Sequence, residues 1–376
     1  MVPVNEPLLD GNEKKYLSEC IDTGWISSEG PFVKRFEEGL AARVGRAHGV
    51  TVSNGSVALD AAVAALRLGP GDAVALPTFT IVSCAAAVVR AGATPIPVDC
   101  DPITFNMDPV QLRVRLEAAF QGRGPRPKAI MVAHIYGLPT EMDPVLEIAG
   151  EFGLKVMEDA AEVHGQEYRG RPCGSFGDLS TFSFYPNKHI TTGEGGMIVC
   201  DDPVLARRCR DLRNLFFDQE RRYIHQELGW NFRMSNIQAA LGVAQLERLD
   251  ESIRKKRHIG RRYNEMLSEV PGLRLPLERT PYAENIYWVY AVVLEDDVPF
   301  DAAEAVKRLT GRKIGTRHFF WPMHLQPVFR KMGLFEGETH PVAERLSRRG
   351  FYIPSGLALT DAQIEETASA LRDIMR

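Results

Sequence analysis

The chain has 376 residues, 44% of them apolar and 25% charged, and it carries a formal net charge of -4. A chain of this length and composition folds as about two or three globular domains and is not disordered throughout. The small net charge argues against a strongly basic nucleic-acid-binding protein, and the longest uncharged run, Ala73–Val89, is too short for a membrane span.

Up to about residue 200, short apolar runs alternate with helical patterns. Helices are predicted at Ser56–Leu68, Ile81–Ala91 and Pro144–Phe152. The predicted strands are Val50–Ser53, Ala73–Pro77, Thr94–Val98, Ala129–His134, Lys155–Glu158, Leu179–Phe184 and Met197–Cys200. Because these runs are apolar on both faces, they predict a largely parallel sheet of an α/β fold, covered by helices.

The pattern changes after residue 200. Ser235–Leu267 predicts one long helix or two, and its basic run Arg254–Arg262 predicts a solvated helix face. Further on, the predicted elements are strands at Trp288–Leu294 and Ile314–Phe320 and helices at Asp301–Leu309 and Asp361–Met375. We therefore expect a large α/β domain over residues 1–245 and a smaller α+β domain over residues 246–376.

The six cysteines form no CxxC pair, and the nine histidines show no HExxH or HxH spacing. Neither a disulfide scaffold nor a zinc site is therefore predicted, and we expect no metal. The N-terminal residues MVPVNEPLLDGNEKK contain early acidic residues and no apolar stretch, so we also expect no signal peptide. Reduced thiols together with this expectation predict a cytoplasmic protein.

The first motif that bears on chemistry is SNGSVAL, Ser53–Leu59, where a predicted strand ends, a turn follows and a helix begins. Free backbone N–H groups and the positive end of the helix dipole make such a turn suitable for phosphate. Helix capping explains the same residues, so the motif alone is weak. The sequence lacks GxGxxG and GxxxxGK[ST], which argues against a dinucleotide-binding fold and a P-loop NTPase.

The second motif is KVMEDAAEVHG, where a predicted buried strand runs directly into Glu158 and Asp159. A carboxylate at the carboxyl end of a strand lies where open α/β sheets bind ligands. Capping of a following helix is the alternative. A buried carboxylate, however, needs a cationic partner or several hydrogen-bond donors.

The third motif is TFSFYPNKHITTGEGGMIVC, a polar turn between two predicted strands. Its Lys188 is the only lysine between Lys155 and Lys255. Exposed lysines are usually only solvated, but burial between strands lowers the pKa of a lysine, and a neutral amine can condense with a carbonyl. Together the three motifs require a ligand that has a phosphate, a basic ring nitrogen and a carbonyl that condenses with lysine. Pyridoxal 5'-phosphate (PLP) has all three groups and is the predicted cofactor.

Seven segments in order resemble the nucleotide-sugar aminotransferases of the DegT/DnrJ/EryC1/StrS group, over about residues 4 to 370. They are TGWISSEGPFVKRFE, SNGSVALDAAVAAL, GDAVALPTFT, GATPIPVDCD, EDAAEVHG, FSFYPNKHITTGEGG and NFRMSNIQAALGVAQLE. The resemblance implies the fold-type I PLP architecture, a seven-stranded sheet with a smaller C-terminal domain. Within the group, the WISS, TTGEGG, NFRMSNI and FFWPMH segments are most similar to those of the GDP-perosamine synthases.

The resemblance also implies roles for single residues. Lys188 matches the lysine that bonds the cofactor, Asp159 matches the partner of the pyridine nitrogen, and Glu162 matches the position beside the cofactor hydroxyl, where the wider family often has Gln. Ile81 stands where the family commonly has an aromatic residue over the cofactor ring, and Phe79 is the alternative cover. Gly55, Ser56 and Ser183 match residues of the phosphate cradle. Asn231 matches an asparagine that reaches the phosphate of a neighbouring subunit. The residues that match segments near the sugar nucleotide are Trp25, Ser27, Arg317, His318 and His324.

By this resemblance the protein is a homodimer with shared sites that moves an amino group from glutamate to a keto sugar nucleotide. Carbon 4 of GDP-4-keto-6-deoxymannose is the expected acceptor, in deoxyamino sugar and O-antigen biosynthesis. The alternatives are a UDP- or dTDP-keto-deoxyhexose or another keto sugar, a PLP sugar dehydratase, and a non-catalytic regulator that binds PLP. The dehydratase is disfavoured because that branch has histidine in place of Lys188.

Overall fold

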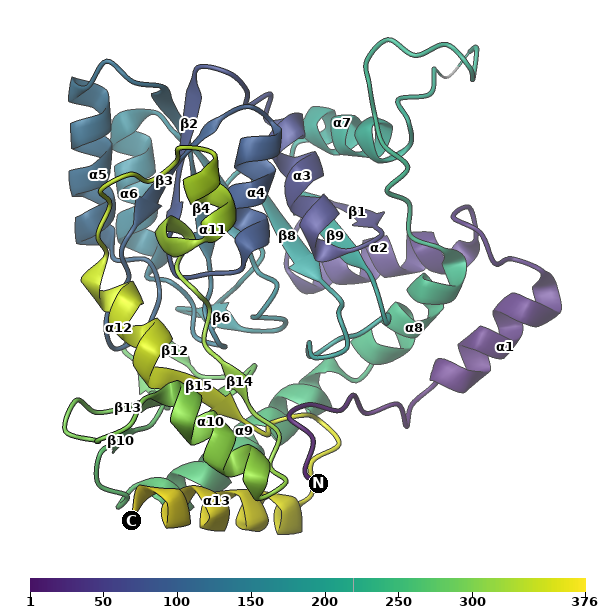
Figure 1. Cartoon of the computed structure of the whole chain (residues 1–376). Helices are drawn as coiled ribbons and strands as arrows, with labels where there is room; N and C mark the ends of the chain where they lie inside the picture. The colour runs from purple at the N-terminus through teal and green to yellow at the C-terminus, as the bar shows by residue number, and fades with distance from the viewer. Residues whose placement is uncertain (219) are drawn as a thin grey trace.

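The computed structural model describes residues 1–218 and 220–376, with a large sheet in the upper part of Figure 1 and a smaller one below it. The large sheet has the strand order β1-β9-β8-β5-β4-β2-β3. Its strands are β1 (His48–Val52), β2 (Asp72–Pro77), β3 (Thr94–Val98), β4 (Arg126–Ala133), β5 (Lys155–Asp159), β8 (Leu179–Ser183) and β9 (Gly196–Cys200). β9 is antiparallel to both neighbours, and the other four pairs are parallel. The seven predicted strands and the α/β fold class are confirmed.

Helices cover both faces of this sheet (Figure 1). Those on one face are α3 (Gly55–Ala65), α4 (Val82–Arg90) and α7 (Pro203–Arg213). Those on the other face are α2 (Pro31–Arg43), α5 (Pro109–Gln121), α6 (Met142–Phe152) and α8 (Asn236–Leu246). Side chains of β4 alternate between the two cores, with Met131 in one and Ile130 and Val132 in the other. A strand buried on both faces is therefore apolar throughout.

The smaller sheet has the strand order β10-β13-β15-β14. Its strands are β10 (Leu273–Arg274), β13 (Tyr290–Leu294), β14 (Arg317–His318) and β15 (Gly350–Ile353). A third core joins it to α9 (Leu249–Leu267), α10 (Ala302–Gly311) and α13 (Asp361–Met375). Its other face, with α12 (Pro341–Arg349), packs against the core that contains α3 and α4. The two sheets therefore share a continuous apolar core.

Several short elements complete the described chain. They are α1 (Glu13–Thr23), β6 (Glu167–Tyr168), β7 (Arg171–Pro172), β11 (Arg279–Thr280), β12 (Ala283–Glu284), the 3-10 helix η1 (Met323–Leu325) and α11 (Pro327–Lys331). Among the described residues, no helix combines the length and the apolar character needed to cross a membrane.

Some sequence expectations are refined by the structure. The predicted helix Ser235–Leu267 is two helices, α8 and α9, and the predicted strand Ile314–Phe320 is a strand only at Arg317–His318. The prediction that the basic run Arg254–Arg262 is a solvated helix face is wrong for Lys256, because this residue is only 1% exposed. The domain boundary near residue 246 stays a prediction; Val2 bridges to Ile314, so the first residues contact the second unit.

Candidate active site

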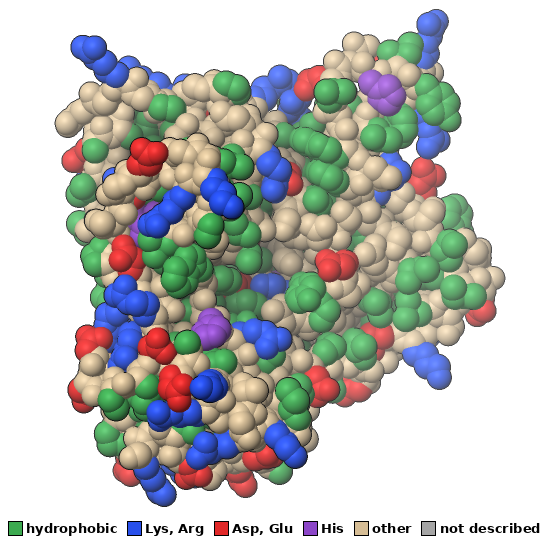
Figure 2. Space-filling model, in the orientation of Figure 1, with side chains coloured by type: hydrophobic (Ala, Val, Ile, Leu, Met, Phe, Trp, Pro, Cys, Tyr) green, Lys and Arg blue, Asp and Glu red, His purple; other side chains and the backbone are tan. Residues whose placement is uncertain are grey.

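A cavity of about 710 Å³ opens at the carboxyl ends of the large sheet's parallel strands. Figure 2 shows the surface hollowed near the centre of the view, between the large unit above and the smaller unit below. The lining residues from the large unit include Gly55, Ser56, Ile81, Asp159, Glu162, Ser183 and Lys188. Trp288, Phe320 and Tyr352 line it from the smaller unit. Seven predicted site residues, distant in the sequence, are thus brought together.

The turn between β1 and α3 forms one end of the cavity. Asn54 caps α3, since its Oδ1 accepts a hydrogen bond of 3.0 Å from the backbone N–H of Val57. A Cβ added at Gly55 would lie 2.6 Å from Cβ of Ser183, at the end of β8, so the close approach of α3 to β8 requires glycine. Ser56 also lines the cavity, and its hydroxyl is 2.7 Å from that of Ser83. The N-terminus of α3, with the hydroxyls of Ser56 and Ser183, forms a cradle suited to phosphate.

Asp159 ends β5 at the floor of the cavity and is buried. Its Oδ1 accepts a hydrogen bond of 3.1 Å from the backbone N–H of Ala161, and the Cys84 thiol donates to Oδ2 at 3.3 Å. Burial raises the pKa of Asp159, although these two donors act in the opposite direction. A protonated ring nitrogen at this position would give the carboxylate the cationic partner that it needs.

Lys188 lies in the turn between β8 and β9, with its amine inside the cavity. Its Nζ is 3.8 Å from Oε1 of Glu162 and 3.7 Å from the ring centroid of Trp288. Burial lowers the pKa of Lys188, and the carboxyls of Glu162 and Asp159 raise it in part. Burial raises the pKa of Glu162 to about 8 despite the nearby lysine. The lysine therefore gives up its proton more readily than an exposed lysine does, and the neutral amine is the form that condenses with a carbonyl and accepts a proton.

The structure distinguishes the two candidate covers for a ring in this cavity. Ile81 is 43% exposed and lines the cavity. Phe79 is fully buried and packs edge-on against Tyr136, Phe319 and Phe320 instead. The apolar cover expected from one chain is therefore Ile81, and Phe79 links the two units.

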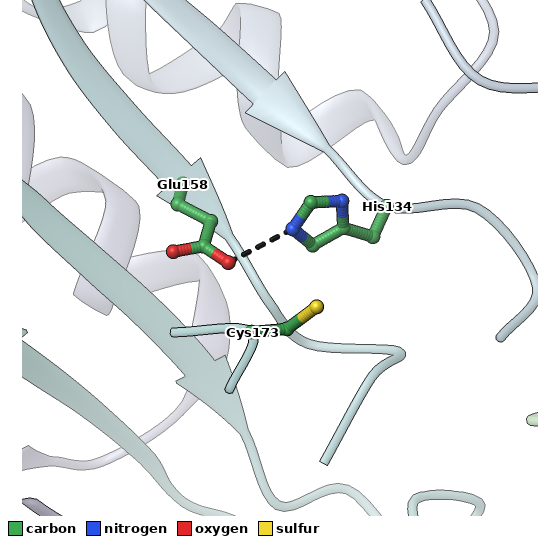
Figure 3. Close-up of side chains that lie close together, drawn as sticks. All are labelled: His134, Glu158 and Cys173. Carbon is green, nitrogen blue, oxygen red and sulfur yellow. Dashed lines mark hydrogen bonds and ion pairs between the residues drawn. The ribbon is translucent and has the colours of Figure 1, made fainter. Parts of the chain in front are cut away.

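His134, Glu158 and Cys173 form a buried cluster (Figure 3), and Glu158 directly precedes Asp159 in β5. Nδ1 of His134 accepts the N–H of Thr140, which leaves the proton on Nε2 to bond Glu158 at 2.9 Å. Glu158 is also held by three further donors: the N–H groups of Gly174 and Phe176 and the hydroxyl of Ser180. These bonds occupy the carboxylate, so we interpret the cluster as a support that fixes the end of β5 and not as a metal site.

Six predicted residues lie outside the cavity of this one chain. Trp25, Ser27, Asn231, Arg317 and His318 are exposed, whereas His324 is buried and bonds Thr78 and Glu344. Arg317 pairs in the small sheet with Tyr352, which does line the cavity. The roles of these six residues stay predictions.

Three residues that contribute to the site were not identified from the sequence. Cys84 bonds Asp159, Trp288 faces Lys188, and Tyr352 lines the cavity. Nothing in the spacing of Trp288 or Tyr352 marks them, because their contacts depend on how the units pack. Cys84 follows the PTFT segment closely, and that position was the available signal.

The observed side chains fit the predicted cofactor. The cradle at Gly55 and Ser183 suits its phosphate, Asp159 suits the ring nitrogen, and the amine of Lys188 suits its carbonyl. The acid and the lysine line the same cavity as the cradle, as one ligand with these three groups requires.

Comparison with known proteins points in the same direction. The DegT/DnrJ/EryC1/StrS aminotransferase family matches residues 7–372. The chain is 40% identical over 374 residues to a GDP-perosamine synthase from Caulobacter vibrioides, covering 100% of this chain and 98% of that protein. It is similar to the crystal structure of S. venezuelae DesV in complex with a ketimine intermediate (TM-score 0.88, 32% identity, 97% and 94% of the two chains). It is also similar to DesI in the presence of its TDP-sugar product (TM-score 0.87, 30% identity, 100% and 92%).

Proposed function

Since this chain belongs to the DegT/DnrJ/EryC1/StrS aminotransferase family, we propose that it transfers the amino group of glutamate to carbon 4 of GDP-4-keto-6-deoxymannose. It is a PLP-dependent sugar aminotransferase. The observation that carries the proposal is the amine of Lys188, buried beside Glu162 in the same cavity as Asp159 and the phosphate cradle. The similarity to a GDP-perosamine synthase over the whole chain favours the GDP sugar.

The chemistry that PLP supplies when bound is to carry the amino group and to withdraw electrons from the substrate carbon. The chain's own residues bind the cofactor and orient it. Gly55, Ser56 and Ser183 hold the phosphate, and the Asp159 carboxylate holds a proton on the ring nitrogen. Lys188 accepts and returns protons at Nζ. Burial lowers the pKa of this amine, which favours the neutral form that accepts a proton. Ile81 excludes water from one side of the ring.

A panel of keto sugar nucleotides tests the acceptor. Purified enzyme with glutamate should aminate GDP-4-keto-6-deoxymannose faster than the UDP or dTDP counterparts. A clear preference for a dTDP sugar, such as the TDP sugar of DesI, would remove the named substrate and leave the aminotransferase chemistry in place. No turnover with any sugar but PLP uptake intact would favour a non-catalytic regulator.

We also propose that Trp25, Ser27, Arg317, His318 and His324 serve the sugar-nucleotide side. The support is that Arg317 pairs with Tyr352 and lies three residues before Phe320, and both aromatic residues line the cavity. A guanidinium can hold a diphosphate with two parallel hydrogen bonds. Arg317→Ala should therefore raise KM for the sugar nucleotide and spare the glutamate half-reaction. The reverse pattern would place Arg317 at the donor carboxylate.

A homodimer with shared sites completes the proposal. The described residues between α7 and α8, 214–218 and 220–235, form a segment that extends away from the body (Figure 1), and its Tyr223 and Leu228 are 83% and 92% exposed. Exposed apolar side chains of this kind mark interaction surfaces. Asn231 bridges to Asn214 at the base of this segment and is not among the residues that line its own chain's cavity, which supports assigning it to the phosphate of a second copy.

Complementation tests the shared site. Lys188→Ala and Asn231→Ala chains, each inactive alone, should regain activity when mixed, because one site of the mixed dimer has both natural residues. Proven subunit exchange without rescue would confine Asn231 to its own subunit. All six cysteines are free and buried, which supports placing the enzyme in the reducing cytoplasm.

A further inference from the structure

The amine of Lys188 lies against the face of an indole ring from the other unit. Its Nζ is 3.7 Å from the ring centroid of Trp288, a buried residue just ahead of β13. Lys188 itself belongs to the turn between β8 and β9 of the large sheet. The environment of this amine is therefore completed only where the two units pack together.

Hydrogen bonds fix Trp288 at both ends. Its Nε1 donates to the carbonyl of Asn187 at 2.8 Å, which ties the ring to the turn that carries Lys188. Its own carbonyl accepts a hydrogen bond of 2.8 Å from Nζ of Lys256, which also donates to the carbonyl of Ser355. Burial lowers the pKa of Lys256 to about 7. A neutral amine has two N–H groups, and these two carbonyls accept both.

We propose that Trp288 is a positioning residue that holds the Lys188 amine against its indole face whenever that amine is not bonded to the cofactor. The inference rests on the proposed role of Lys188. The negative face of an indole ring attracts an ammonium group, most strongly where water is excluded. A lysine side chain without this contact would sample many rotamers. Because the ring holds the side chain in one place, less conformational entropy is lost when the amine approaches the reacting atoms again.

Fluorination of the indole ring tests the inference, because it changes the charge distribution of the ring while keeping its shape. The chain is produced with tryptophan analogues that bear one to three ring fluorines, which weaken the negative face stepwise. The full-length apoprotein is mixed with PLP, and the rate of uptake is followed by absorbance against pH. Because only the neutral amine condenses, a weaker face should move the midpoint of this profile to lower pH with each fluorine. The total shift expected is about 0.4 to 1.5 pH units, the range for loss of a cation–π contact.

The titratable groups around Lys188 are the carboxyls of Glu162 and Asp159, the imidazoles of His164 and His189, and the amine of Lys256. Fluorination leaves all of these groups in place, so a stepwise shift of the midpoint is caused by the indole ring. A Trp288→Phe chain carrying the same analogues at its other three tryptophans should show no stepwise shift. Trp321 is the matched control, because its indole N–H also donates to a backbone carbonyl, and Trp321→Phe should retain the full series.

A midpoint that stays constant across the fluorine series would overturn the inference and leave the proposed function intact. A stepwise shift that persists in Trp288→Phe would also overturn it, since another tryptophan would then be responsible. Uptake of PLP at the same rate and pH dependence in Lys188→Ala would overturn the proposed function, and the inference with it.

Discussion

Replacing Glu162 with glutamine tests whether this acid works in its protonated form. The carboxyl accepts a hydrogen bond of 2.8 Å from the backbone N–H of Tyr136, and its other oxygen is 3.8 Å from Nζ of Lys188. Burial raises the pKa of Glu162 to about 8, against the lowering effect of the lysine. At pH 7 the protonated form of Glu162 therefore predominates.

A protonated carboxyl and an amide have nearly the same shape, and each offers an acceptor and a donor. Glu162→Gln should therefore keep kcat/KM within about twofold of the natural enzyme at pH 7. Above pH 8 the two should diverge. The ionised Glu162 raises the pKa of Lys188, so the natural enzyme should gain less activity with rising pH than the glutamine variant, in which no such charge forms.

The assay is the rate of the glutamate half-reaction from pH 6 to pH 10, with Glu162→Ala as the control. Alanine removes the acceptor for the buried N–H of Tyr136, which costs about 1–3 kcal/mol of stability in denaturant unfolding. A loss of more than tenfold in Glu162→Gln at pH 7, with its stability retained, would refute the reasoning. The carboxylate would then be the working form.

Three further predictions concern single contacts. Gly55→Ala should weaken PLP binding at least tenfold in titrations, because the added Cβ meets Ser183, whereas Gly150→Ala, with open space around it, should leave binding unchanged. Asp159→Asn should slow the glutamate half-reaction by about a hundredfold, or about 2.7 kcal/mol of barrier, in stopped-flow absorbance; an unchanged rate would leave Asp159 a structural residue. For Lys256, the unfolded chain binds more protons than the folded chain between about pH 7 and 10.5. The natural enzyme should therefore gain stability relative to Lys256→Met as the pH rises through that window, and thermal unfolding without this trend would contradict the lowered pKa.

The large sheet was predictable because its strands are buried on both faces. The run Ala129–His134 is apolar until its polar residue at the strand end, and Leu179–Phe184 combines apolar residues with small hydroxyl side chains that are also buried. Parallel strands bring their carboxyl ends to one edge, so Asp159 and Ser183 had to lie near each other. The motif residues of the large unit were found for this reason.

Contacts that depend on packing between elements were not predictable in the same way. Phe79 and Ile81 are two residues apart, and the structure alone shows that one is buried in an aromatic cluster and the other lines the cavity. Lys256 is a different case. It lies three residues after Ile253 and four before Gly260, on the buried stripe of α9, so helical spacing was sufficient to place it inside. The basic composition of the run obscured that spacing.

The position of Lys256 explains why the smaller unit matters for chemistry that is located in the large one. The acid, the amine and the phosphate cradle all follow strands of the large sheet. Yet the ring that faces the amine is supplied by Trp288, and its carbonyl is held by a lysine on α9. Burial of Lys188 under that ring lowers its pKa, and burial follows from the packing of α9 and β13 against the sheet. A change that loosens this packing would admit water, raise the pKa of Lys188 toward its ordinary value and slow the reaction while leaving the cofactor's phosphate cradle intact.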